Sequence, residues 1–108
     1  MAQDFERVRQ RNVGTSATAI LSVNSDDAII SIRCANTTTS TINIEVYIES
    51  ASANYYLIKN CPIVSGGSLE LIDGGSKIVL QSGDIVYVKS DTASSLDVWM
   101  STVDAIST

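Results

Sequence analysis

Residues 42–49 read Ile42-Asn43-Ile44-Glu45-Val46-Tyr47-Ile48-Glu49, a strict alternation of large apolar side chains with mostly polar ones. Successive side chains of a β-strand point to opposite faces, so this segment has one face suited to a core and one suited to solvent. In a helix the same four apolar side chains would spread around the whole circumference. The segment is therefore predicted to be a half-buried strand.

Short apolar segments recur on both sides of residues 42–49, separated by turns rich in Gly, Ser, Asn and Asp. The strongest hairpin signal is Asp73-Gly74-Gly75-Ser76, because glycine adopts positive φ without strain. About eight short strands at roughly ten-residue spacing are typical of an antiparallel β-sandwich of the jelly-roll or immunoglobulin-like type. Besides residues 42–49, the predicted strands are 15–23, 28–35, 55–59, 69–72, 77–80, 85–89 and 96–103.

The chain is predicted to consist of one domain and a short N-terminal arm. Its 108 residues and 44% hydrophobic content fit a single globular domain, which we place at residues 14–108. Residues 1–13 are polar and basic, and their main apolar side chains are Phe5, Val8 and Val13. Phe5 and Val8 would share one face of a short helical turn, and an extended arm anchored by Phe5 fits the sequence equally well.

The chain is acidic overall but basic in the arm. Seven Lys and Arg oppose twelve Asp and Glu, giving a net charge of -5. This balance repels phosphate backbones and argues against a nucleic-acid partner. Arg7, Arg9 and Arg11 lie in the arm, and a basic arm on an acidic body is suited to contact a neighbouring copy or another acidic protein. We predict Phe5 and these three arginines as interface residues.

The sequence shows no targeting signal and no membrane-spanning segment. Its first seven residues lack the apolar stretch of a secretory signal. No apolar run approaches the ~18 residues that are needed to cross a bilayer. We therefore expect a protein that is made in the cytoplasm and has no membrane partner.

The composition argues against catalytic chemistry. The chain has no histidine, which removes the commonest general base and metal ligand and excludes a Ser-His-Asp or Cys-His arrangement. Gly66-Gly67 and Gly74-Gly75 lack a following Lys-Ser or Lys-Thr, so they indicate turns and not phosphate-binding loops. Glu45 and Glu49 remain as candidates for a hydrolase pair, although solubility and protection of an exposed sheet face explain them better. We expect no enzymatic activity, no cofactor and no metal.

The cysteines and three aromatic side chains are further candidate contact residues. Cys34 lies on the apolar face of its predicted strand and is expected to be a small buried side chain. Cys61 lies at a predicted sheet edge, and we expect it to be accessible and to belong to an interface. A disulfide, between Cys34 and Cys61 or to another subunit, is left open by the sequence. Tyr55, Tyr56 and Trp99 could form a platform on which a sugar stacks. More commonly, such aromatic side chains belong to a core or to a subunit contact.

Three segments resemble small structural proteins of tailed-bacteriophage virions. They are Asn12-Val13-Gly14-Thr15-Ser16-Ala17-Thr18, residues 55–75, and Ser90-Asp91-Thr92-Ala93-Ser94-Ser95-Leu96-Asp97-Val98. The resemblance covers most of the chain from residue 12 on, and its motifs are turns and strands that specify no chemistry. Many such proteins have an alanine where this chain has Cys61, and this departure favours a specific use for the thiol.

The resemblance implies a β-sandwich that assembles in many copies on a virion. Its implied partners are copies of itself and other virion proteins. The implied positions are the capsid surface, as a decoration protein, the neck or collar, and the tail. The alternative function is a tail-associated module that binds a receptor or a carbohydrate.

Overall fold

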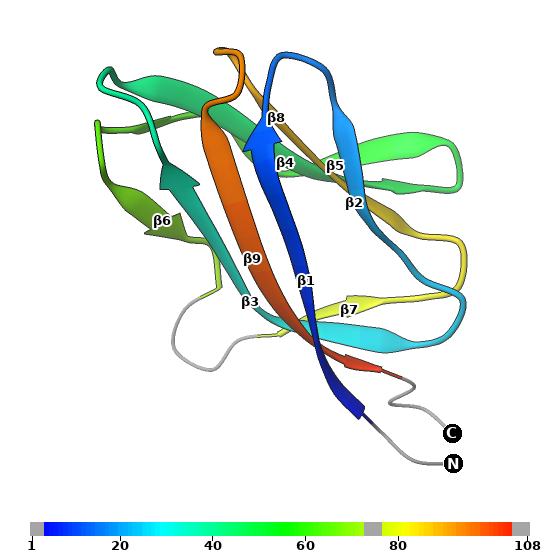
Figure 1. Ribbon diagram of the computed structural model, residues 1–108. Coiled ribbons are helices and arrows are strands. Elements are labelled where there is room, and N and C mark those ends of the chain that lie inside the picture. Colours follow the sequence, from blue (N-terminus) through cyan, green and yellow to red (C-terminus); the bar gives the residue numbers. More distant parts are fainter. Residues whose placement is uncertain (1–3, 73–76, 105–108) are drawn as a thin grey trace.

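The computed structural model describes residues 4–72 and 77–104, and these form two antiparallel β-sheets packed face to face (Figure 1). None of the described residues forms a helix long and apolar enough to cross a membrane. The predicted hairpin at residues 73–76 lies outside the described residues. The strands are β1 (Asp4–Val13), β2 (Thr18–Ser22), β3 (Asp27–Asn36), β4 (Ile42–Ser50), β5 (Ala53–Ile63), β6 (Ser68–Glu70), β7 (Ile78–Leu80), β8 (Ile85–Ser90) and β9 (Leu96–Asp104).

The strand order identifies the sandwich as a jelly roll. One sheet has the order β1-β9-β3-β6, with β7 also paired to β3, and the other has the order β2-β8-β4-β5. Because β6 pairs with residues 33–35 of β3 and β7 with residues 27–29, the two short strands share one edge position. Counted as one strand, they complete two four-stranded sheets between which the chain repeatedly crosses, as in jelly rolls. The predicted antiparallel sandwich is confirmed, and the topology selects its jelly-roll form.

The core lies between the two sheets and is built from alternating aliphatic side chains. The apolar face of residues 42–49 is buried as predicted, with Ile42, Ile44 and Val46 at 0% exposure. Each fully buried aliphatic side chain stabilises the fold by about 1.5–3 kcal/mol relative to an exposed one. The other fully buried large side chains come from both sheets and are Val13, Ile29, Ile32, Cys34, Leu80, Val86, Val88, Leu96 and Met100.

The N-terminal segment is part of the sandwich from residue 4 onward. The expected arm is extended, but instead of lying apart it forms β1, which pairs along β9 at the edge of the five-stranded sheet. Of its side chains, Val8 packs against the core and Val13 is buried in it, while Phe5 is 80% exposed. The alternative of a helical turn at Phe5 and Val8 is therefore wrong. The sheet is continued by main-chain pairing, with little apolar burial from β1.

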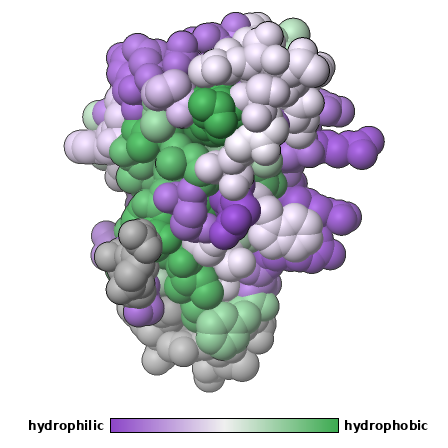
Figure 2. All heavy atoms as spheres, turned by 90° about the vertical axis from the view of Figure 1, so that its left-hand side faces the viewer, coloured by the Kyte–Doolittle hydropathy of each residue, from purple (hydrophilic) through white to green (hydrophobic). Residues whose placement is uncertain are grey.

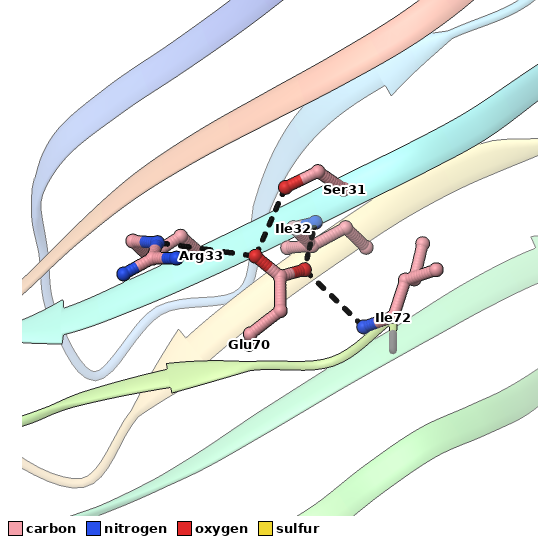
Figure 3. Close-up of polar contacts among 5 residues, drawn as sticks. All are labelled: Ser31, Ile32, Arg33, Glu70 and Ile72. Carbon is pink, nitrogen blue, oxygen red and sulfur yellow. Dashed lines mark hydrogen bonds and ion pairs between the residues drawn. The ribbon is translucent and has the colours of Figure 1, made fainter. Parts of the chain in front are cut away.

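The opposite edge of the same sheet is held by a side chain where no strand pairs. Residues 30–32 of β3 lie between the parts paired with β6 and β7. There Glu70 Oε2 accepts hydrogen bonds from the amides of Ile32 (2.8 Å) and Ile72 (3.3 Å), and Oε1 accepts one from the Ser31 hydroxyl (2.9 Å) (Figure 3). The carboxylate thus takes the place of a main-chain acceptor and joins β6 to the middle of β3.

The short strands leave this edge of the sandwich incompletely covered. Seen from that side, apolar side chains form a band that runs alongside a small group of hydrophilic ones (Figure 2). Leu69, Leu71 and Ile78 are only partly buried, although they pack against the core. Each of β6 and β7 has three residues, so neither strand is long enough to close the edge.

Candidate contact surface

The outward side chains of β1 gather on the exposed face of the five-stranded sheet. Strand alternation puts Phe5, Arg7 and Arg9 on the same side of β1. Arg11 lies at the register shift between Gln10 and Val13, and it lines one hollow together with Arg9. Arg9 is directly opposite Trp99 on β9, and Trp99 is directly opposite Arg33 on β3. The buried neighbours of Trp99 in β9 point into the core, so this row of three side chains faces solvent. Arginines from two distant parts of the sequence therefore flank one exposed indole.

We call Arg7, Arg9, Arg11, Arg33 and Trp99 the arginine–tryptophan face. The Trp99 side chain is 49% exposed, and the Arg7 guanidinium carbon lies 5.4 Å from the centroid of its ring, a cation–π geometry. A hollow of about 650 Å³ lies beside the indole, between β1, β9 and β3, and Arg9, Arg11 and Arg33 line it. All four arginines of the chain belong to this face. The arrangement presents planar cations and an aromatic surface to a partner.

Of the four arginines of this face, Arg33 alone has a salt-bridge partner among residues 4–72 and 77–104. In this salt bridge Arg33 Nε lies 3.8 Å from Glu70 Oε1. Because the Arg33 side chain is 62% exposed, this pair contributes little to stability. Arginine guanidinium groups match carboxylates in a two-pronged geometry. The face is therefore suited to carboxylate groups of another protein.

A row of tyrosines crosses the outer face of the other sheet. The Tyr47 ring lies 5.0 Å from that of Tyr56 on β5 and 5.2 Å from that of Tyr87 on β8, the second pair being nearly parallel at 15°. Lys59 Nζ lies 4.6 Å from the Tyr56 centroid. Partial burial, followed by the neighbouring tyrosines, raises the pKa of Tyr47. Tyr56 remains 43% exposed at the end of this row.

The residues proposed for sugar stacking do not form one surface. Trp99 lies on β9 in the five-stranded sheet, whereas Tyr55 and Tyr56 lie on β5 at the edge of the other sheet.

Glu45, one of the two carboxylates considered for hydrolysis, is directly opposite Lys89 on β8. Opposite charges in this position stabilise an antiparallel strand pair. This position agrees with the structural explanation of that carboxylate.

The two cysteines are free thiols, and the disulfide between them that the sequence left open is not formed. Cys34 is 0% exposed, and its burial, followed by the charges of Glu70 and Cys61, raises its pKa to about 12. It is therefore protonated and unreactive near neutral pH. Cys61 is partly buried on β5, in the other sheet from the arginine–tryptophan face. The structure thus brings together the interface residues predicted in β1 and leaves Cys61 apart from them.

Sequence reasoning missed Arg33 and the tyrosine row. Arg33 alternates with Ile32 and Cys34, which marks it as a solvent-facing residue of its strand. Nothing in the local pattern indicates that it lies two strands from Arg9, because strand register between distant segments is set by the fold.

Among the described residues no group of three or more cysteine, aspartate and glutamate side chains is placed to hold a metal ion.

The strand order and surface define a class of protein, a jelly-roll β-sandwich with one basic, aromatic face. No protein-family model matches the chain, and no curated protein matches its sequence. Among solved structures, the chain is similar to a protein of Bacillus endospore appendages, described as a novel family of disulfide-linked pili. The two share 16% identity, with 94% of this chain and 84% of that chain covered and a TM-score of 0.54. At this identity the likeness supports the fold.

Proposed function

We propose that this chain is a bacteriophage virion structural protein that assembles in many copies on the particle, as a capsid decoration protein or a neck or collar protein. The observation that carries the proposal is the arginine–tryptophan face, an exposed surface that collects every arginine of the chain around its one tryptophan. Tryptophan and arginine are enriched at the centres of protein interfaces. The role proposed is therefore binding to protein, with no catalytic step.

Two further observations support a virion role. The segments 12–18, 55–75 and 90–98 resemble small structural proteins of tailed bacteriophages. Jelly rolls also recur in viral capsid proteins, although they occur in lectins and other proteins as well, so the fold argues by analogy. Together with the contact face, these features favour a subunit of a larger particle over a separate receptor-binding module.

The thiols argue that repeated assembly of this chain is non-covalent. The structurally similar pilus is described as disulfide-linked. In this chain Cys34 is fully buried, so Cys61 is the one thiol that a neighbour can reach without unfolding. A single accessible thiol links two copies and then has no further bond to make. Any intersubunit disulfide through Cys61 would therefore produce pairs, and extended assembly would depend on surface contacts.

Removal of residues 1–12 tests the proposal. We expect the shortened chain to remain folded, because Val13 stays in place and Val8 is the deleted side chain that packs on the core. We expect it to be absent from purified particles when it is supplied during infection, whereas the full-length chain is present in many copies by quantitative mass spectrometry. The deletion removes Arg7, Arg9 and Arg11 together with the edge strand.

A second variant guards against loss of folding in the deletion. Phe5→Ser combined with Arg7→Ser leaves the main-chain pairing of β1 with β9 intact, and we expect it too to be incorporated poorly. A Lys59→Ser chain, changed on the other sheet, serves as the control and should be incorporated normally. Normal incorporation of both β1 variants, or absence of the full-length chain from particles, would contradict the proposal.

A further inference from the structure

We infer that the arginine–tryptophan face binds the acidic surface of a second copy of this chain, so that copies join head to tail. This inference rests on the proposed assembly in many copies and specifies its contact. It assigns one side of the contact to Arg7, Arg9, Arg11, Arg33 and Trp99. The other side is the remaining, acidic surface of the neighbouring copy.

The charge distribution identifies the occupant of the face. Apart from its four arginines and Asp97, which lines the same hollow, the chain has three lysines and eleven acidic residues, which sum to -8. Each copy thus carries a compact basic face and a strongly acidic remainder, and the two attract each other at short range. A phosphate backbone would meet the same basic face, but the net charge of -5 opposes its approach to the molecule. A second copy carries the same net charge, but unlike a phosphate backbone it has a basic face of its own, so that basic and acidic surfaces can alternate along an assembly.

The same charges exclude a symmetric contact through this face. A two-fold axis would place the four arginines of one copy against the four of the other, and like charges across an interface are strongly unfavourable. Two-fold antiparallel pairing of the free edge of β1 with another β1 would also bring Arg7, Arg9 and Arg11 close to the same residues of the neighbour. The contact must therefore join two different surfaces. Contacts of that kind build closed rings or open filaments.

The local geometry fits carboxylate side chains inserted beside the indole. The hollow between β1, β9 and β3 is lined by Arg9 and Arg11 on one side of Trp99 and by Arg33 on the other. Asp97 also lines it, and because its Oδ1 accepts the amide hydrogen of Asn12 and three arginines line the same hollow, the lining stays basic. An acidic side chain that enters it meets planar donors and displaces water from the exposed ring. Arg7 already rests on the same ring, which limits the rotamer entropy that it loses on binding.

Sedimentation velocity of the purified full-length chain over a range of concentrations tests the inference. We expect the wild type to form species larger than dimers, and salt raised from about 0.05 to 0.5 M to weaken them, since exposed charges are screened. Arg9→Glu should weaken association by about tenfold or more, because it places a like charge against the acidic partner. Lys59→Glu, the matched control, makes the same change in net charge at an exposed residue of the other sheet and should not weaken it.

Thermal unfolding of both variants confirms that each remains folded before it is compared with the wild type. If Arg9→Glu assembles as well as the wild type does, or if the wild type stops at a dimer, the assigned contact is overturned and the proposed assembly still stands. A wild type that stays monomeric at all concentrations would count against the proposed self-assembly, and with it against this contact. The two failures are therefore distinguishable in one experiment.

Discussion

Replacement of Asn36 by alanine is expected to lower the free energy of unfolding by about 3 kcal/mol. Asn36 is 3% exposed at the end of β3. Its Nδ2 donates to the carbonyls of Ser40 (2.8 Å) and Ile63 (2.9 Å), and its Oδ1 accepts from the amide (2.9 Å) and the hydroxyl (2.7 Å) of Thr38. One buried amide therefore connects β3, the β3–β4 loop and the end of β5.

The cost of this substitution comes from the groups that it leaves behind. Alanine removes the partner of the buried Ile63 carbonyl, and an unsatisfied buried polar group costs about 1–3 kcal/mol. Thermal unfolding should show a midpoint lower by about 15 °C in a domain of this size. Asn43→Ala, at an exposed asparagine of β4, is the matched control and should cost less than about 1 kcal/mol. Equal effects at the two positions would contradict this role of Asn36.

Replacement of Glu70 by alanine is expected to cost about 2 kcal/mol of unfolding free energy. Its carboxylate accepts the amide hydrogens of Ile32 and Ile72, for which the structure gives no strand partner at this edge. It also accepts the Ser31 hydroxyl, so that three donors lose an acceptor at once. Chemical denaturation, read by circular dichroism, measures the loss.

Glu70→Gln separates hydrogen bonding from charge at this position. The glutamine carbonyl can accept both amide hydrogens, while its NH₂ group can donate to the Ser31 oxygen. We therefore expect a loss of less than about 1 kcal/mol, because the Arg33 ion pair is exposed and contributes little. A glutamine variant as unstable as the alanine variant would show that the charge, rather than the acceptor geometry, holds this edge.

The fold was predictable from the sequence to the extent that it depends on local alternation. Residues 42–48 alternate with a period of two, and the structure buries the predicted face of β4. β1 was interpreted as an arm because its inward positions include Glu6 and Gln10, which hide the apolar half of the pattern. The period of two that is typical of a strand is nevertheless present, because arginine occupies every second position at Arg7, Arg9 and Arg11. For an edge strand with few apolar contacts, a period of this kind is the strongest sequence signal available.

The contact surface was only half predictable. The β1 arginines were identified from their charge, and the structure places them together. Their neighbours Trp99 and Arg33 depend on the pairing of β9 with both β1 and β3, which joins residues far apart in the sequence. Trp99 was grouped with Tyr55 and Tyr56 because all three are large and aromatic, and the two-sheet topology separates them. Register and topology are properties of the whole fold, so no single segment contains them.

Fluorescence of Trp99 tests the central claim most directly, because it is the only tryptophan of the chain and lies within the proposed contact. In dilute solution at high salt, we expect long-wavelength emission and efficient quenching by acrylamide, as for a half-exposed indole. As the purified chain assembles at higher concentration and lower salt, we predict a shift to shorter wavelength and a clear loss of quenching. An assembled chain whose Trp99 emission and quenching equal those of the monomer would contradict the account.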